Sequence, residues 1–217
     1  MDNIFIINKP LEWTSMDVIR KMQRILNFKK IGHAGTLDPL ATGVLIVCVG
    51  KATKRINEFM DMQKEYVTDI NLTAFSETDD AQGPLHPVEI QHVPSKQEVE
   101  KVLQNFIGDI EQIPPKFSAI KIQGKRAYKK AHAKEKFNMP PRHVTIHSIE
   151  LINYTWPYLT IKVTCSKGTY IRALGRDIGA KLQTGGYLAS LTRSAIGPYI
   201  LDQAQTLEQL QEEFKQN

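Results

Sequence analysis

The chain has 217 residues, with 28 Lys or Arg against 23 Asp or Glu and a formal net charge of +5. Hydrophobic residues make up 41% and charged residues 24%, which is ordinary globular composition and excludes a disordered or fibrous protein. The longest apolar run, Val44–Val49, is far shorter than the ~20 residues of a membrane span, and the N-terminus lacks the basic region of a signal peptide. We expect a cytoplasmic protein with no membrane partner, in which Cys48 and Cys165 are buried thiols.

Hydrophobic periodicity predicts the first elements. Apolar residues at 4–7 suit a strand, and an apolar stripe after Ser15, a candidate N-cap, predicts a helix to about Asn27. Val44–Val49 has the composition of a strand buried on both faces, and 66–72 alternates as a half-buried strand does.

The second half follows the same rules. The capping box Ser95-x-x-Glu98 predicts a helix, residues 158–165 alternate as a strand, and Thr169 could cap a helix through Leu182. Residues 185–196 suit a strand, and Thr206-x-x-Gln209 opens a last helix. Because no βαβ rhythm appears, we predict a single α+β domain over 1–217 with a largely antiparallel sheet.

Positive charge is concentrated in residues 116–147. This segment has a single acid, Glu135, and aromatic side chains lie between its cations. Phosphate-directed cations interleaved with stackable rings suit RNA, so we predict an RNA-binding insertion with Lys129 and Lys130 as contacts; a solvated surface is the alternative. Its nine cations are Lys116, Lys121, Lys125, Arg126, Lys129, Lys130, Lys134, Lys136 and Arg142.

The densest functional pattern is Gly32–Gly43, which contains His33 and Asp38. No third His, Cys or acid stands at metal-ligand spacing, and the segment lacks the Gly-Lys-Ser/Thr ending of a phosphate loop. A single carboxylate can act as a covalent nucleophile if a cation orients it. On the residues alone, Asp38 could equally be a turn residue before Pro39.

A second group of residues lies at the predicted strand-to-helix junction 165–172. Tyr170 and Arg172 stand there, and Arg172 is either a surface cation or the ion-pair partner of Asp38. Tyr66 begins its strand, and on the residues alone it suits a half-buried sheet aromatic.

Together these motifs resemble the TruB family of tRNA pseudouridine synthases, in family order over nearly the whole chain. The matching segments are Lys9-Pro10, Thr14-Ser15, 33–43, 51–54, Thr78-Asp79-Asp80 with Gly83, 114–121, Gly124-x-Arg126-Ala127-Tyr128, 166–172 and Leu191-x-Arg193. Glu12 stands where the family usually has Gly, which we expect to alter a turn and not catalysis. Many members also continue into a C-terminal RNA-binding (PUA) domain, which we do not expect in this chain ending at Asn217.

The resemblance implies a pseudouridine synthase fold with a mixed, mostly antiparallel central sheet, flanking helices and a catalytic cleft. It implies isomerisation of the TΨC-loop uridine of tRNA (position 55) to pseudouridine, without cofactor or metal, after the base is flipped out of the loop. Asp38 matches the family's nucleophile, Arg172 its ion-pair partner, and Tyr66 the ring that stacks on the flipped base and helps remove the C5 proton. Substrate-contacting positions of the family match His33, Tyr170 and Leu191.

The partner implied is therefore the T stem-loop of tRNA, bound by a monomer. A non-catalytic RNA-binding or tRNA-folding protein is the alternative, and it would not need Asp38, Tyr66 and Arg172 together. An RNA glycosidase would need an activated water, for which no second carboxylate can be nominated.

Overall fold

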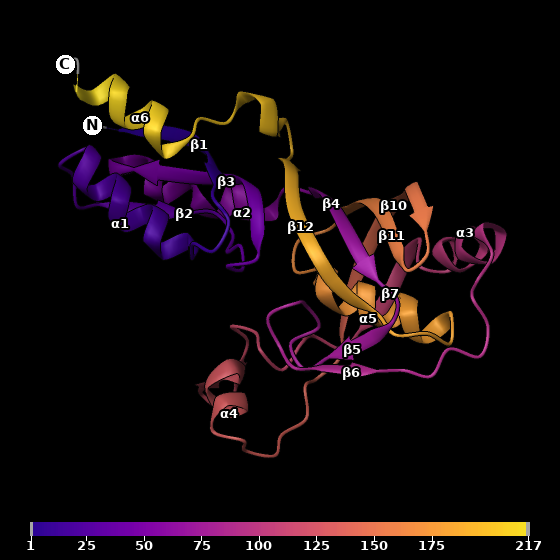
Figure 1. Cartoon of the computed structure of the whole chain (residues 1–217). Coiled ribbons are helices and arrows are strands. Elements are labelled where there is room, and N and C mark those ends of the chain that lie inside the picture. The colour runs from indigo at the N-terminus through magenta and orange to yellow at the C-terminus, as the bar shows by residue number, and fades with distance from the viewer. Residues whose placement is uncertain (1, 216–217) are drawn as a thin grey trace. The chain divides into compact units, whose positions relative to one another are not determined.

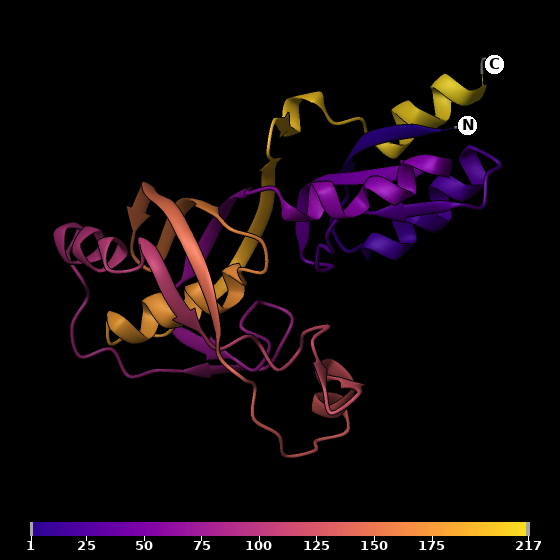
Figure 2. The ribbon, with the colours of Figure 1, turned by 180° about the vertical axis from the view of Figure 1, so that it is seen from behind.

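The computed structural model describes residues 2–215. The chain forms two compact parts, the first from residues 1–67 and 191–217 and the second from residues 68–190 (Figures 1 and 2). The boundaries between the parts fall inside two strands, β4 (Lys64–Asn71) and β12 (Tyr187–Ile196). Among the described residues, no helix is both long and apolar enough to cross a membrane.

The first part is a sheet with helices packed on it. Strand β3 lies at its centre and is buried along nearly its whole length, as the apolar run predicts. It pairs antiparallel with β1 and β2, and parallel with the end of β12. The elements are β1 (Asn3–Lys9), α1 (Ser15–Ile25), β2 (Ile31–His33), β3 (Ala41–Val49), η1 (Gly50–Arg55), α2 (Ile56–Asp61), β13 (Tyr199–Ile200), η2 (Leu201–Gln203) and α6 (Leu207–Lys215).

Helices α1 and α6 cover one face of this sheet and share one hydrophobic core (Figure 1). Phe5 and Ile7 of β1 pack there against Val18 and Met22 of α1 and Leu210 of α6. Burying such side chains contributes about 1.5–3 kcal/mol each, so this apolar stripe is what holds α1 on the sheet.

The predicted start of α1 needs a correction. The N-cap is Thr14, whose side chain forms a reciprocal capping box with Asp17, and not Ser15. The Ser15 hydroxyl is buried and bonds the backbone of Leu37 instead. Sequence favours Ser and Thr equally as caps, so only the tertiary contact distinguishes these neighbours.

The second part is built on a sheet in which the strands follow the order β12, β4, β11, β10, β7. The pairs β10–β11 and β10–β7 are antiparallel. The mixed, mostly antiparallel architecture predicted from the sequence is thus confirmed. The remaining elements are β5 (Ala74–Ser76), β6 (Leu85–Pro87), α3 (Lys96–Gln104), β7 (Gly108–Gln112), β8 (Lys121–Ile122), β9 (Lys125–Arg126), α4 (Ala127–His132), β10 (Arg142–Thr155), β11 (Tyr158–Cys165) and α5 (Ile171–Lys181).

Two predicted helix starts fall in this part. Ser95 caps α3 in the predicted box with Glu98. Thr169 does not cap α5: its hydroxyl donates to the carbonyl of Ser166, and Tyr170 occupies the N-cap position without a side-chain bond. The first turn of α5 is therefore held by other contacts, which belong to the candidate site.

Candidate active site

Asp38 lies in the connection between β2 and β3, residues 34–40, which we call the Asp38 loop. The loop begins where Ala34 N–H donates to Ile46 C=O (2.9 Å) and ends in a turn in which Ala41 N–H donates to Asp38 C=O (3.0 Å). Both ends of the loop are therefore bonded to β3 or lead directly into it.

The start of α1 holds the middle of the Asp38 loop. Leu37 N–H donates to the Ser15 hydroxyl oxygen (2.9 Å), and the hydroxyl donates to Leu37 C=O (3.2 Å). Glu12 N–H donates to Pro39 C=O (2.9 Å). Asp38 thus stands between two residues whose backbones are fixed.

Two buried cations complete this framework. Lys9 is 0% exposed and Arg193 1%. The Lys9 ammonium donates to Trp13 C=O (2.6 Å) and lies 3.5 Å from Pro39 C=O. Arg193 donates through Nη2 to Gly35 C=O (3.1 Å). Charge-assisted bonds to carbonyls are stronger than neutral ones, so these cations restrain the Asp38 loop from both sides.

The electrostatics of the loop reflect this burial. Desolvation lowers the pKa of Lys9 to about 8, while the negative charge of Asp38 acts in the opposite direction. Burial, assisted by the positive charge of Arg193, lowers the pKa of His33. His33 is therefore a neutral imidazole near pH 7, able to donate and accept hydrogen bonds.

Leu191 lies beside the end of the Asp38 loop. It is 8% exposed, and in the parallel pairing of β12 with β3 it stands opposite Ala41. Two residues further on, the same strand carries Arg193, so one short segment of β12 brings both Leu191 and the buried guanidinium to the loop.

Tyr66 is half-buried in β4 and precedes the boundary of the first part. Its strand is held at the start by Lys64, whose ammonium donates to Met60 C=O (2.5 Å) and Met62 C=O (2.5 Å). Cations suit the carbonyls left unpaired at a helix C-terminus, here that of α2.

In the second part, Arg172 lies in the first turn of α5 and is 6% exposed. Its guanidinium donates to Thr78 C=O (2.8 Å) and Phe117 C=O (3.0 Å) and lies 3.5 Å from a carboxylate oxygen of Asp80. Asp80 is itself buried and accepts from the Thr78 hydroxyl (2.5 Å). Arg172 therefore has a fixed position before any substrate arrives.

Arg176, one helical turn later, repeats this arrangement. It pairs with Asp79 (2.9 Å) and donates to Ile113 C=O (2.9 Å). Burial still raises the pKa of Asp79 to about 6, against the attraction of Arg176. Residues i and i+4 of a helix share a face, so α5 holds the acidic turn at 79–80 with two adjacent arginines.

Tyr170 is positioned through its backbone by Gln112. The Gln112 side-chain amide accepts from Tyr170 N–H (2.9 Å) and donates to Tyr170 C=O (3.1 Å). Gln112 is 0% exposed, so this reciprocal pair takes the place of a conventional cap at the start of α5.

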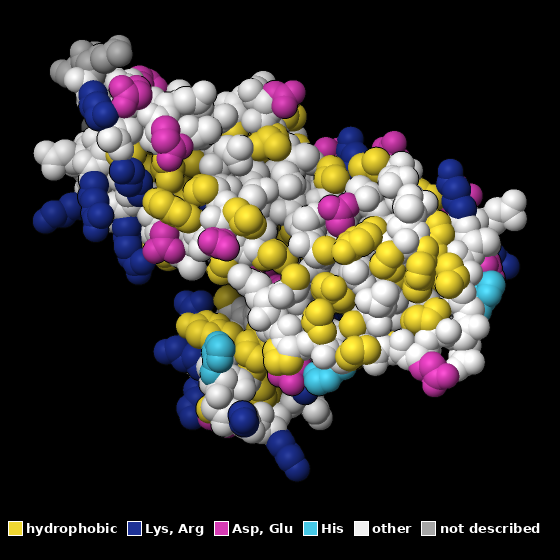
Figure 3. Space-filling model, in the orientation of Figure 1, with side chains coloured by type: hydrophobic (Ala, Val, Ile, Leu, Met, Phe, Trp, Pro, Cys, Tyr) yellow, Lys and Arg dark blue, Asp and Glu magenta, His cyan; other side chains and the backbone are white. Residues whose placement is uncertain are grey.

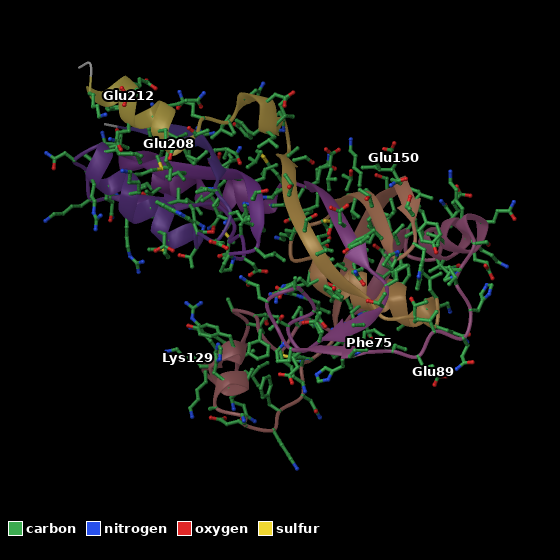
Figure 4. All side chains as sticks on the ribbon, viewed as in Figure 1. Phe75, Glu89, Lys129, Glu150, Glu208 and Glu212 are labelled. Carbon is green, nitrogen blue, oxygen red and sulfur yellow. The ribbon has the colours of Figure 1, made fainter. Side chains whose placement is uncertain are left out.

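The basic segment forms a small hairpin with β8, β9 and α4, and dark blue side chains gather around it in Figure 3. The rings of Phe117 and His132 meet edge to face at 5.2 Å. Lys129 is exposed on α4, where Figure 4 labels it. Lys130 is different: its side chain is 10% exposed and its ammonium pairs with Glu135 at 3.2 Å.

The predicted site residues are divided between the two parts of the chain. The first part brings together His33, Asp38 and Leu191 around β3 and also carries Tyr66. The second part carries Lys129, Lys130, Tyr170 and Arg172. Within the described residues, no three His, Cys, Asp or Glu side chains are grouped so that they could hold a metal ion.

Sequence reasoning did not assign a function to several residues of this framework. Little in the sequence marked these residues as functional, because a lysine, arginine or glutamine is normally a surface residue. Lys9, Asp80 and Arg193 did stand inside the motifs of the resemblance, which is the signal that could have found them. The unassigned residues are Lys9, Asp80, Gln112, Arg176 and Arg193.

Known sequences that match this chain indicate the same family. The family described as TruB family pseudouridylate synthase (N terminal domain) matches residues 23–171. The tRNA pseudouridine synthase B of Parabacteroides distasonis is 44% identical over 99% of this chain and 94% of its own length. That of Bacteroides fragilis is 47% identical over 92% of this chain and 88% of its own.

Solved structures agree. A chain of the crystal structure of a Cbf5-Nop10-Gar1 complex matches 96% of this chain with a TM-score of 0.76 and 30% identity. A structure of an H/ACA RNP bound to a substrate RNA containing 2'-deoxyuridine matches 96% with a TM-score of 0.73 and 27% identity. This chain spans about half of each of those chains, 53% and 52%.

Proposed function

The chain belongs to the TruB family of pseudouridylate synthases and is thus an isomerase of tRNA; from this we propose that it converts the TΨC-loop uridine (position 55) to pseudouridine, with Asp38 as nucleophile. The observation that carries the assignment to Asp38 is its loop. Backbone atoms on both sides of Asp38 are fixed by α1, β3 and two buried cations. A backbone held in this way gives the Asp38 side chain a fixed point of attachment before substrate binds, and such positioning favours covalent catalysis.

In the proposed reaction, a carboxylate oxygen of Asp38 bonds to a carbon of the target nucleotide, in the base or in the ribose. The N1–C1′ bond breaks, the base turns, and a C5–C1′ bond forms. A carboxylate bonded to ribose C1′ is displaced as the C5–C1′ bond forms, whereas one bonded to the base leaves as the C5 proton is removed. In both cases a general base takes the C5 proton and N1 takes up a proton. Product and substrate are isomers, so the step needs no oxidant or reductant.

We assign removal of the C5 proton to Tyr66 and substrate contacts to His33, Tyr170 and Leu191, on the family resemblance. The lowered pKa of His33 supports such a contact, because a neutral imidazole can both donate a hydrogen bond to RNA and accept one from it. The ion pair of Arg172 with Asp38 remains a prediction.

We further propose that the basic hairpin binds the T stem-loop. Its exposed cations and its aromatic side chains suit phosphates and unstacked bases, and a base inside a folded loop must be extruded before chemistry. The solved relative bound to a substrate RNA supports RNA as the partner. Buried thiols at Cys48 and Cys165 support a reducing compartment, the cytoplasm.

Tritium release from C5-labelled uridine in a T stem-loop transcript tests the proposal. Asp38→Asn keeps the side-chain size but removes the nucleophilic charge, so turnover is expected to fall to background while RNA binding persists. Asp202→Asn, an exposed aspartate of η2, is the matched control and is expected to keep full activity. Tritium release by Asp38→Asn would refute the mechanism.

Tritium release by the wild-type protein also tests the alternative function. A non-catalytic RNA-binding or tRNA-folding protein would bind the transcript and release no tritium. Turnover in the wild type that is lost in Asp38→Asn excludes it.

A further inference from the structure

A second basic region lies on the first part of the chain, outside the candidate site and the basic hairpin. Residues 18–37 contain five cations and no acid. We call four of them the α1 basic face, and dark blue side chains gather over α1 in Figure 3. Its members are Lys21 and Arg24 of α1 and Lys29 and Lys30 of the turn that follows.

The charges of these four cations are not neutralised by a nearby ion pair within the part of the chain that the structure describes. Among residues 2–215, none of them forms an ion pair, whereas the fifth cation, Arg20, pairs with Asp17 at 2.8 Å. Some cations of other helices do pair with an acid one turn away, as Lys215 does with Glu212 and Lys96 with Glu100. Like charges three or four residues apart on a helix repel each other, so Lys21 and Arg24 favour an external anion.

Two grooves lie along the α1 basic face. Lys21 and Arg24 stand between two grooves of about 330 Å³ each and line both of them. One groove is also lined by Trp13, Arg20 and two acids, Glu12 and Asp17, and the other by Phe214 and Lys215 of α6, with no acid among the described residues of its lining. Lys21 and Arg24 line two neighbouring grooves and do not enclose a single pocket. This arrangement suits a chain of anions better than one small ion.

The turn that carries Lys29 and Lys30 has a defined conformation. Gln23 donates from its side-chain amide to Lys29 C=O (2.8 Å), and Gly50 N–H donates to Lys30 C=O (2.8 Å). Both lysine side chains are exposed while their backbones are held, so the charges are presented from a fixed base.

Helix α1, which carries two residues of the face, starts beside the Asp38 loop. Ser15, the first residue of α1, is bonded to Leu37, and Arg24 stands nine positions further along the helix. At 1.5 Å per residue this is about 14 Å along the helix axis. A polyanion with one unit at Asp38 needs to extend only about this distance to reach Arg24.

We propose that the α1 basic face binds backbone phosphates of the substrate tRNA away from the reacting nucleotide. The proposal rests on the proposed function for the identity of the RNA. It adds a binding surface that acts on affinity and not on chemistry. Phosphate contacts of this kind position an RNA without reading its sequence.

The test uses the full chain and full-length tRNA. The double variant Lys21→Ala/Arg24→Ala is expected to weaken Kd about 10-fold near physiological salt and to lower the slope of log K against log salt by about two units. Its single-turnover rate at saturating enzyme is expected to equal that of the wild type. Lys101→Ala/Lys181→Ala removes two exposed helix cations elsewhere, without ion pairs among the described residues, and is the control for net charge.

An unchanged slope, an equal change in the control, or a lowered single-turnover rate would overturn the proposal. So would an unchanged tRNA affinity with lost binding to phosphatidylserine vesicles, which would assign the face to a membrane surface. Binding is measured without turnover, so a wild type that binds tRNA but releases no tritium refutes the proposed function alone. A wild type that turns over, with a variant of unchanged slope, refutes this inference alone.

Discussion

Lys9 and Arg193 place positive charge inside the first part of the chain, where charge is costly. Each compensates by donating to carbonyls around the Asp38 loop, Lys9 to Pro39 and Arg193 to Gly35. Removing one partner of a buried, hydrogen-bonded charge leaves the others unsatisfied, at about 1–3 kcal/mol per group. The hydrogen bonds to this loop therefore explain why Lys9 and Arg193 are buried.

The lowered pKa of Lys9 predicts a pH dependence of stability. Its pKa is about 8 in the folded chain against an ordinary 10.5, so between these values the unfolded chain binds more protons and stability rises with pH. The free energy of unfolding of the wild type minus that of Lys9→Met is expected to increase by about 1–3 kcal/mol over this window. Urea titrations at pH 8 and 10.5 measure it.

The control for Lys9 is Lys101→Met, which replaces an exposed lysine of α3. Its stability relative to the wild type should not depend on pH in this window. The same pH dependence in both variants would assign the effect to general charge and not to burial.

Tyr66→Phe separates the two functions proposed for that ring. Stacking needs only the ring, whereas proton removal needs the phenol oxygen. We expect near-normal tRNA affinity with a single-turnover rate reduced at least ~100-fold, the lower end of acid–base catalysis. Tyr158→Phe, an exposed tyrosine of β11, should match the wild type. Full turnover in Tyr66→Phe would leave Tyr66 as a platform for the base.

At the scale of elements, the pairing of β3 with β12 depends on Gly43. Its φ is +99°, and a Cβ there would stand 2.3 Å from the backbone oxygen of Arg193. Any larger residue must therefore separate the strands that bring Leu191 and Arg193 to the Asp38 loop.

Gly43→Ala is accordingly expected to cost about 2–5 kcal/mol in the free energy of unfolding, the sum of backbone strain and overpacking. Gly108→Ala is the matched control, because its φ is +103° and nothing lies within 4 Å of the added Cβ. The control should lose only the strain, about 1–2 kcal/mol. Chemical denaturation compares them, and equal losses would contradict the steric argument.

The helix starts show how far an element can be read from the sequence. The box at Ser95 was predicted correctly because both partners lie three residues apart in the chain. Ser15 and Thr169 were predicted as caps and are not, since their hydroxyls bond Leu37 and Ser166. A local pattern identifies a residue able to cap; its tertiary neighbours decide whether it does.

At the scale of the whole molecule, charge is distributed unevenly. Residues 116–147 carry a net +8 within a chain of net +5. Salt screens the cations that contact phosphates. The salt dependence of the RNA affinity should therefore come from the basic regions of the chain and not from its surface as a whole.

Lys129→Ala is expected to reduce the log–log salt slope of T stem-loop binding by about one unit, for one lost phosphate contact. Lys101→Ala removes the same charge from α3 and should leave the slope unchanged. Filter binding at several salt concentrations measures both. An unchanged slope for Lys129→Ala would make it a solvated surface residue.

The sequence by itself determined the buried strand at 44–49, the α+β class, the basic segment 116–147 and the segment that contains Asp38. Each is encoded by neighbours in the chain, through alternation, helical spacing, composition or a motif. Only the tertiary structure decided which groups hold that segment. Arg193 reaches Gly35 of that segment across 158 positions, and in the second part Arg172 reaches Thr78 of the turn before Asp80 across 94. Such contacts depend on strand pairing and helix packing, and a lysine or arginine that will be buried looks in sequence like one that faces water.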